Sequence, residues 1–151
     1  MVPDASFLAD AAETSTPLGE AAAELRRRIG RETLIAPTLI IWELGSSFRR
    51  HRTHSSYTIP KEAAQAIERL LDKVVFDSPD AMVLRRTLEL AVRHSLSVFD
   101  ASYLELAARD ADTVLVTHDG PLRDAARREL GVDRALDTYA GLERFPAVAA
   151  E

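Results

Sequence analysis

The sequence predicts a single α/β domain over residues 1–151, with three layers in which helices flank a central, mostly parallel sheet of about five short strands. Apolar runs of strand length alternate with longer segments whose apolar residues recur at helical spacing. Thr16 and Ser78 are each followed by proline, a pattern typical of helix starts. No internal repeat, linker or low-complexity segment divides the chain. These features indicate one domain in which helices connect parallel strands.

Residues 96–119 are expected to place two carboxylates at one edge of this sheet. A helix over residues 101–110 would carry the chain ~15 Å away from Asp100. The apolar strand 113–117 would return it by ~16 Å, and Asp119 follows shortly after. Because the two excursions nearly cancel, Asp100 and Asp119 are expected to lie near each other, at the edge where open α/β sheets place their sites.

The remaining elements follow from periodicity and from turn residues. Pro3 is unfavourable inside a strand because it has no amide to donate. Asp4 ends a strand in this interpretation, and the alternative is a helix cap. In the first part of the chain we expect a very short strand within residues 1–7 that ends at Asp4, a helix from Pro17 to Gly30, a strand over 33–36, a helix from Pro37 to about His51 and a polar loop over 49–57. A helix after Pro60, a strand over 73–76 and a helix with Ala81, Leu84, Leu88 and Ala91 on its apolar face should follow. After the helix and strand of residues 96–119, we expect a helix from Gly120 to Leu130 and an edge strand over 135–139.

Composition limits the function classes. The hydrophobic fraction of 46% excludes a disordered chain, and the apolar runs fall far short of the ~20 residues that a membrane span needs. The first ten residues hold no Lys or Arg, unlike a secretory signal, so the predicted location is cytoplasmic. The absence of cysteine excludes disulfides, thiolate zinc sites and cysteine nucleophiles. The net charge is −5, but clustered arginines are compatible with a polyanionic substrate; solvated helix faces are the alternative.

Four acidic residues are candidates for a shared site: Asp4, Glu43, Asp100 and Asp119. The three aspartates fall at strand ends or helix starts that face one edge of the sheet. Glu43 lies in a helix that is apolar nearly all round, so we expect it to be half-buried. A half-buried carboxylate must be protonated, paired with an arginine such as Arg50, or bound to a cation.

Convergence of these carboxylates would require neutralisation. Two like charges ~4 Å apart repel by about 4 kcal/mol at an effective dielectric constant of ~20. Either some carboxyls stay protonated or a hard divalent cation binds, and an all-oxygen set favours Mg²⁺ or Mn²⁺ over zinc. Ser6 and Thr117 lie two residues from Asp4 and Asp119 and are candidates to hold the carboxylates or metal-bound water; turn hydroxyls are the alternative. Such a site would hydrolyse phosphodiester bonds.

Four segments carry a family resemblance. PDASFL, WELGSSFRR, SVFDASYLELA and VTHDGPL, in this order and over nearly the whole chain, resemble the PIN-domain ribonucleases, specifically the VapC toxins of bacterial and archaeal toxin–antitoxin pairs. The resemblance implies metal ligands at Asp4, Glu43, Asp100 and Asp119, with Ser6 and Thr117 as neighbouring hydroxyls. It also implies a Mg²⁺- or Mn²⁺-dependent endoribonuclease that cleaves structured RNA such as tRNA or rRNA, and a homodimer inhibited by a cognate antitoxin with a basic tail.

Two residues depart from the family pattern, and other families fit the sequence less well. Pro3 stands where a β-former is expected, and His118 occupies a variable position; we expect His118 to be a solvent-exposed loop residue, with a phosphate contact as the alternative. A receiver domain would need a lysine near its phosphoaspartate, and neither lysine is placed for that. A haloacid-dehalogenase-like phosphatase would need Asp where Ser6 stands. The remaining alternatives are a non-catalytic protein-binding module of the same fold and a housekeeping RNA-processing nuclease.

Overall fold

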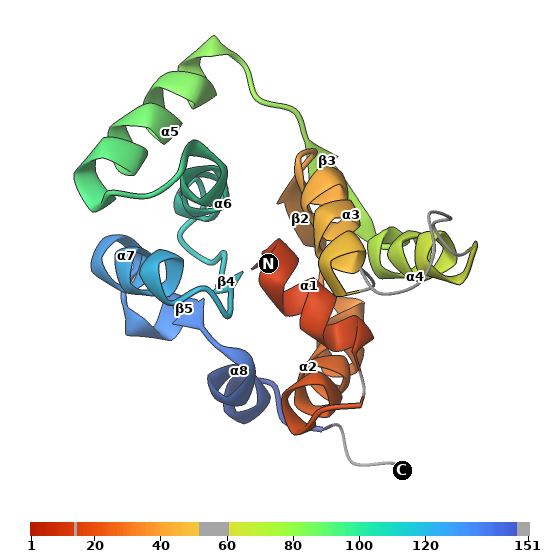
Figure 1. Ribbon diagram of the computed structural model, residues 1–151. Coiled ribbons are helices and arrows are strands. Elements are labelled where there is room, and N and C mark those ends of the chain that lie inside the picture. Colours follow the sequence, from red (N-terminus) through yellow and green to blue (C-terminus); the bar gives the residue numbers. More distant parts are fainter. Residues whose placement is uncertain (14, 52–60, 148–151) are drawn as a thin grey trace.

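A computed structural model describes residues 1–13, 15–51 and 61–147 of the chain (Figure 1). The strands predicted over 33–36 and 73–76 are present, each shifted by one residue, and the other three are present in shorter form. Helix α8 was not predicted, and α1 follows Asp4 as in the helix-cap alternative. The elements are β1 (Val2–Pro3), α1 (Ala5–Ala12), α2 (Pro17–Arg28), η1 (Ile29–Arg31), β2 (Leu34–Pro37), α3 (Ile40–His51), α4 (Lys61–Leu71), β3 (Val74–Asp77), α5 (Ala81–His94), α6 (Val98–Ala108), β4 (Leu115–Val116), α7 (Gly120–Leu130), η2 (Val132–Arg134), β5 (Ala135–Leu136) and α8 (Thr138–Arg144).

The strands pair in parallel, as predicted, but they form two sheets. One has the order β1-β4-β5, and the other pairs β2 with β3. Pro3 accounts for the division. The Asp4 amide donates to the Val116 carbonyl at 3.0 Å, so the next position back, Pro3, faces β2, where it has no amide to donate. The Ile35 amide still donates to the Met1 carbonyl at 2.9 Å and holds β2 beside β1.

Helices cover the strands on both sides. In Figure 1, α5, α6 and α7 lie on one side and α1 to α4 on the other, while α8 packs on α2 near the carboxyl end of the chain. α6 is the most deeply placed helix, with both apolar and polar side chains buried along it, including Tyr103 and Glu105. Because all the strands run in parallel, the residues that follow them emerge at a common edge.

The helix predicted to end at about His51 does so, and residues 52–57 of the loop predicted over 49–57 lie outside the described residues. Two expectations about helix caps were wrong. Asp80, rather than Ser78, caps α5, and Ser97 caps α6, which places Asp100 in the first turn of that helix. Local hydroxyl and carboxylate side chains compete for the same amides, so the position of a cap is decided by where the helix starts to pack.

The apolar face of α5 was also predicted in the wrong place. The buried residues of this helix are Thr87, Leu90 and Ala91, whereas Leu84 and Leu88 are exposed. The helix has apolar residues on two sides, and α6 covers one of them. No helix in the described part of the chain is long and apolar enough to cross a bilayer.

Candidate functional site

Asp4 is held at the junction of β1 and α1 by a set of hydrogen bonds. The carboxylate accepts from the Phe7 amide at 2.9 Å, which caps α1, from the Ser6 hydroxyl at 2.8 and 2.9 Å, and from the Thr117 hydroxyl at 2.6 Å. Burial raises the pKa of Asp4, and these hydrogen bonds and the neighbouring His118 act in the opposite direction. Both hydroxyls singled out in the sequence, Ser6 and Thr117, therefore contact this carboxylate directly.

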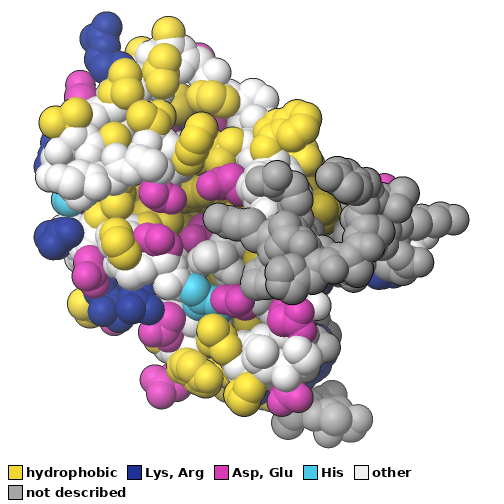
Figure 2. Space-filling model, viewed as in Figure 1, with side chains coloured by type: hydrophobic (Ala, Val, Ile, Leu, Met, Phe, Trp, Pro, Cys, Tyr) yellow, Lys and Arg dark blue, Asp and Glu magenta, His cyan; other side chains and the backbone are white. Residues whose placement is uncertain are grey.

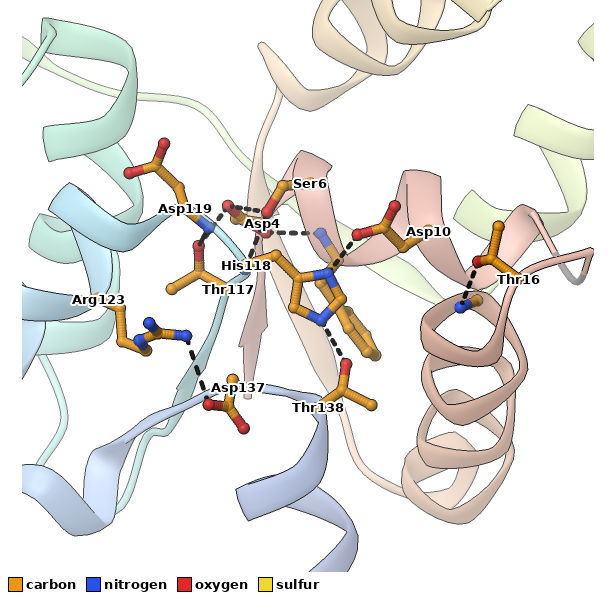
Figure 3. Close-up of polar contacts among 12 residues, drawn as sticks. Asp4, Ser6, Asp10, Thr16, Thr117, His118, Asp119, Arg123, Asp137 and Thr138 are labelled. Carbon is orange, nitrogen blue, oxygen red and sulfur yellow. Dashed lines mark hydrogen bonds and ion pairs between the residues drawn. The ribbon is translucent and has the colours of Figure 1, made fainter.

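Thr117 links Asp4 to Asp119. Its hydroxyl donates to Asp4 and accepts from the Asp119 amide at 2.9 Å, as Figure 3 shows. Asp119 is the N-cap of α7, and its Oδ1 accepts from the Leu122 amide at 2.7 Å. The two aspartates thus lie at the carboxyl ends of neighbouring strands and share one buried threonine.

Glu43 is half-buried, as predicted, and its partner is a tyrosine. The Tyr103 hydroxyl donates to Glu43 Oε2 at 2.5 Å. Burial is the main cause of the raised pKa of Glu43, and the charges of Asp100 and Asp4 raise it further. The pKa of Tyr103 is raised mainly by burial and then by Glu43, so the phenol keeps its proton and remains the donor. The side chain of Arg50, considered from the sequence as a partner, lies outside the described residues.

Asp100 is positioned by the cap of its own helix. The Ser97 hydroxyl accepts from the Asp100 amide at 3.0 Å and donates to its Oδ2 at 2.6 Å. The negative charge of Asp100 acts on both Glu43 and Tyr103. Tyr103 was not recognised from the sequence. Its position one turn after Asp100 on the same helix was the signal that could have found it.

The acidic cluster, defined here as Asp4, Glu43, Asp100 and Asp119, is assembled from four separate elements. Acidic side chains gather near the middle of the face seen in Figure 2. Asp4 and Asp100 act electrostatically on Glu43, and Asp119 joins the cluster through Thr117. Among the described residues, no three Asp, Glu or His side chains are close enough to surround one ion.

The donor chemistry of the cluster fits a hard divalent cation. Its atoms are carboxylate and hydroxyl oxygens; burial disfavours the ionised forms of Asp4 and Glu43, and repulsion by the charges of Asp100 and Asp4 adds to this at Glu43. A divalent cation would relieve that repulsion. Mg²⁺ is usually held by one or two carboxylates and keeps several waters, so it does not need a closed cage of three side chains.

His118 is not the solvent-exposed loop residue that we expected. Its Nδ1 contacts the Asp10 carboxylate and its Nε2 contacts the Thr138 hydroxyl (Figure 3). Its ring meets the ring of Phe7 edge-on, with centroids 5.9 Å apart. These partners lie on α1 and α8, distant in sequence, which is why local context did not reveal them. The His118 amide also donates to the Ser6 hydroxyl at 3.0 Å.

Comparison with known protein families shows which family this chain belongs to. A family model described as PIN domain matches residues 1–128. The chain belongs to the PIN domain family. PIN domains are typically metal-dependent nucleases and commonly use Mg²⁺ or Mn²⁺. A comparison with curated proteins gave no match.

A solved structure shares the PIN fold of this chain. The crystal structure of PAE2754 from Pyrobaculum aerophilum is similar, with a TM-score of 0.70 and 23% sequence identity, over 97% of this chain and 89% of that one. The matched PIN region ends at residue 128, before β5 and α8. In this PIN domain the later segment nevertheless supports the site: Thr138 contacts His118, and Asp137 accepts from Arg123 at 3.3 Å.

Proposed function

We propose that this PIN domain is a Mg²⁺- or Mn²⁺-dependent endoribonuclease that hydrolyses RNA phosphodiester bonds at the acidic cluster. The observation that supports this most is the placement of Glu43, a half-buried carboxylate that accepts from Tyr103 and whose pKa is raised first by burial and then by the charges of Asp100 and Asp4. A purely structural role does not account for like charges brought together, because such crowding costs folding free energy.

Neighbouring protein groups hold the carboxylate oxygens of the cluster in place. Tyr103 anchors Oε2 of Glu43, Ser97 anchors Oδ2 of Asp100, and the Leu122 amide anchors Oδ1 of Asp119. One oxygen of each of these three carboxylates is thereby held by the protein. A bound Mg²⁺ or Mn²⁺ would supply charge neutralisation and a more acidic water. In this proposal Thr117 and Ser6 hold Asp4 rigidly, so that little reorganisation is needed when RNA binds.

Conservative substitution tests the assignment. Asp100→Asn and Asp4→Asn should each abolish metal-dependent RNA cleavage while the circular-dichroism spectrum persists. Asp124→Asn, on the exposed side of α7, is the matched control and should cleave like the wild type. Mg²⁺ or Mn²⁺ should raise the Tm of the wild type, by mass action, and raise that of Asp100→Asn less. Cleavage that survives both site substitutions would refute the proposed site.

The proposed biological role is that of the toxin of a type II toxin–antitoxin pair, acting on tRNA or rRNA and inhibited by a cognate antitoxin. The sequence resemblance to VapC toxins supports it, and an antitoxin with a basic tail would complement the acidic cluster. Induced expression should arrest growth, and Asp100→Asn should not. A gene directly upstream that encodes a short protein with a DNA-binding amino-terminal half would favour this role over a housekeeping nuclease.

The homodimer expected for such a toxin has a candidate interface on α5. Its outer face carries Leu84, Leu88 and Val92, the last 82% exposed, beside Arg85 and Glu89. These residues contribute to the lining of a shallow groove of about 710 Å³. In an antiparallel pair of α5 helices centred on Leu88, Leu84 would meet Val92 of the second copy and Glu89 would lie beside its Arg85.

This pairing makes a charge-exchange test possible. Leu88→Glu should give a monomer by light scattering. Arg85→Glu and Glu89→Arg should each weaken the dimer, and the double variant should restore it, because the two contacts are symmetric. A dimer that persists in Leu88→Glu would exclude α5 as the interface.

A non-catalytic binding module of the same fold is the second candidate, supported by the same exposed apolar face. It predicts no RNA cleavage by any metal and a Tm that millimolar Mg²⁺ or Mn²⁺ leaves unchanged.

A further inference from the structure

Two solvent-exposed aromatic residues are adjacent in sequence to residues of the acidic cluster. Trp42 is 78% exposed and immediately precedes Glu43, while Phe99 is 61% exposed and immediately precedes Asp100. Large aromatic residues usually supply core and interface contacts, so a tryptophan kept almost wholly in solvent leaves most of its apolar surface unused. Trp42 is the single tryptophan of the chain.

The two rings lie on the two helices, α3 and α6, that a hydrogen bond joins at the acidic cluster. This hydrogen bond runs from Tyr103 on α6 to Glu43 on α3, at 2.5 Å. Phe99 is four residues before Tyr103, so it lies on the stripe of α6 that faces α3. Trp42 lies in the first turn of α3, on the side away from the buried Ile40.

The helix starts bring these rings and the carboxylates to the same edge. The Tyr103 hydroxyl, one turn after Asp100 on α6, donates to Glu43 in the first turn of α3, so the starts of the two helices are joined there. Figure 2 shows hydrophobic side chains next to the acidic ones on this face. A phosphodiester that reaches the carboxylates therefore has an exposed aromatic residue next to Glu43 and another next to Asp100.

We infer that Trp42 and Phe99 are stacking platforms for unpaired bases beside the scissile phosphate, and that they position the RNA at the acidic cluster. This inference rests on the proposed nuclease function. Every base offers a π-face to an aromatic ring, whereas the bases of a duplex are already stacked on each other. Stacking also needs no positive charge, which suits a chain with a net charge of −5 whose site repels phosphate.

A protein partner is the competing occupant, because Ile41 and Val98 beside the two rings are also partly exposed, by 40% and 41%. The placement of the aromatic residues favours RNA. Each ring is adjacent in sequence to a carboxylate of the site, one on each helix, whereas a docking face for a protein would not need this relation to the carboxylates.

The single tryptophan makes the inference directly measurable. The full-length Asp100→Asn variant, which is expected not to cleave, is titrated in Mg²⁺ with unpaired oligoadenylate while Trp42 emission is recorded. A matched abasic oligomer, which has the same phosphates without bases, and a blunt RNA duplex are the control ligands. Emission should be quenched by the unpaired RNA and little changed by the other two.

Substitutions then measure the contribution of each ring. In the same background, Trp42→Ala and Phe99→Ala should each weaken binding of unpaired RNA by about 5- to 150-fold, measured by fluorescence anisotropy of labelled RNA. Trp42→Phe should retain most of the affinity. Met82→Ala, which removes an exposed apolar side chain from α5, is the matched control and should bind like its parent. In the cleaving wild-type background, both alanine variants should raise KM more than they lower kcat.

The outcomes separate this inference from the proposed function. If the wild type cleaves RNA with Mg²⁺ and both alanine variants bind and cleave as it does, the stacking role is overturned and the nuclease stands. Equal quenching by the abasic oligomer also overturns the stacking role. If no metal supports cleavage, the nuclease proposal fails, whatever the emission of Trp42 does. Loss of binding to a co-expressed antitoxin, with RNA binding unchanged, assigns the two rings to a protein partner instead.

Discussion

Replacing Thr117 by valine should destabilise the protein far more than the loss of one hydroxyl usually does. The Thr117 side chain is fully buried, and its hydroxyl is the only atom that changes to a methyl group. It donates to Asp4 Oδ2 at 2.6 Å and accepts from the Asp119 amide at 2.9 Å. Valine keeps the shape of the side chain and removes both hydrogen bonds.

The expected cost follows from these two bonds. A hydrogen bond to a charged group contributes about 1.5–3 kcal/mol, and an amide left without a partner in a buried place costs about 1–3 kcal/mol. Ser6 still donates to Asp4, and the Asp119 amide is only partly buried, so the lower ends of both ranges apply. We expect the free energy of unfolding to fall by about 2.5 kcal/mol.

Urea denaturation without metal provides the measurement, and Thr87→Val provides the control. Thr87 is also buried, but its hydroxyl donates to the Val83 carbonyl at 2.9 Å within α5, so the carbonyl keeps its helical partner when the hydroxyl is removed. Thr87→Val should therefore cost less than about 1 kcal/mol. Equal costs for the two variants would refute the argument that Thr117 joins two strand ends, as would a Thr117→Val variant with the stability of the wild type.

Three further predictions concern other parts of the molecule. His118→Ala and Thr138→Val should both destabilise, and a double-mutant cycle should give a coupling of about 1 kcal/mol, because the two side chains contact each other; additive effects would contradict the contact. Gly19→Ala should destabilise by about 1–3 kcal/mol because a Cβ there would lie 1.6 Å from the Glu13 carbonyl oxygen, whereas Gly45→Ala, with no atom within 4 Å, should stabilise α3 by about 0.5–1 kcal/mol; a reversed order in urea denaturation would be inconsistent with the packing. Hydrogen bonds from Arg93 and His94 lower the pKa of Glu129 below its usual 4.5, so its contribution is present above that pH and is lost as the pH falls through the lower, folded-state pKa. Glu129→Gln should therefore cost stability at pH 7 and less at pH 3, and a cost independent of pH would show that the ion pairs contribute nothing.

Most of the secondary structure could be predicted because its causes are local. Apolar spacing, a proline after a cap and a glycine at an end act within a few residues, and they located α2 and α7 closely. The exceptions also have a physical reason. α5 has two apolar sides, and only its packing on α6 decides which one is buried.

For the site, the sequence by itself indicated that Asp4 and Asp119 follow parallel strands and that Asp100 begins a helix, and from this it predicted a shared site at one edge of the sheet. It also indicated that Glu43 would be half-buried. Only the tertiary structure decided the partners of these groups: Tyr103 for Glu43, 60 residues away, and Asp10 and Thr138 for His118. Hydrogen bonds between distant elements depend on how helices pack across the sheet, and no local pattern of residues encodes that geometry.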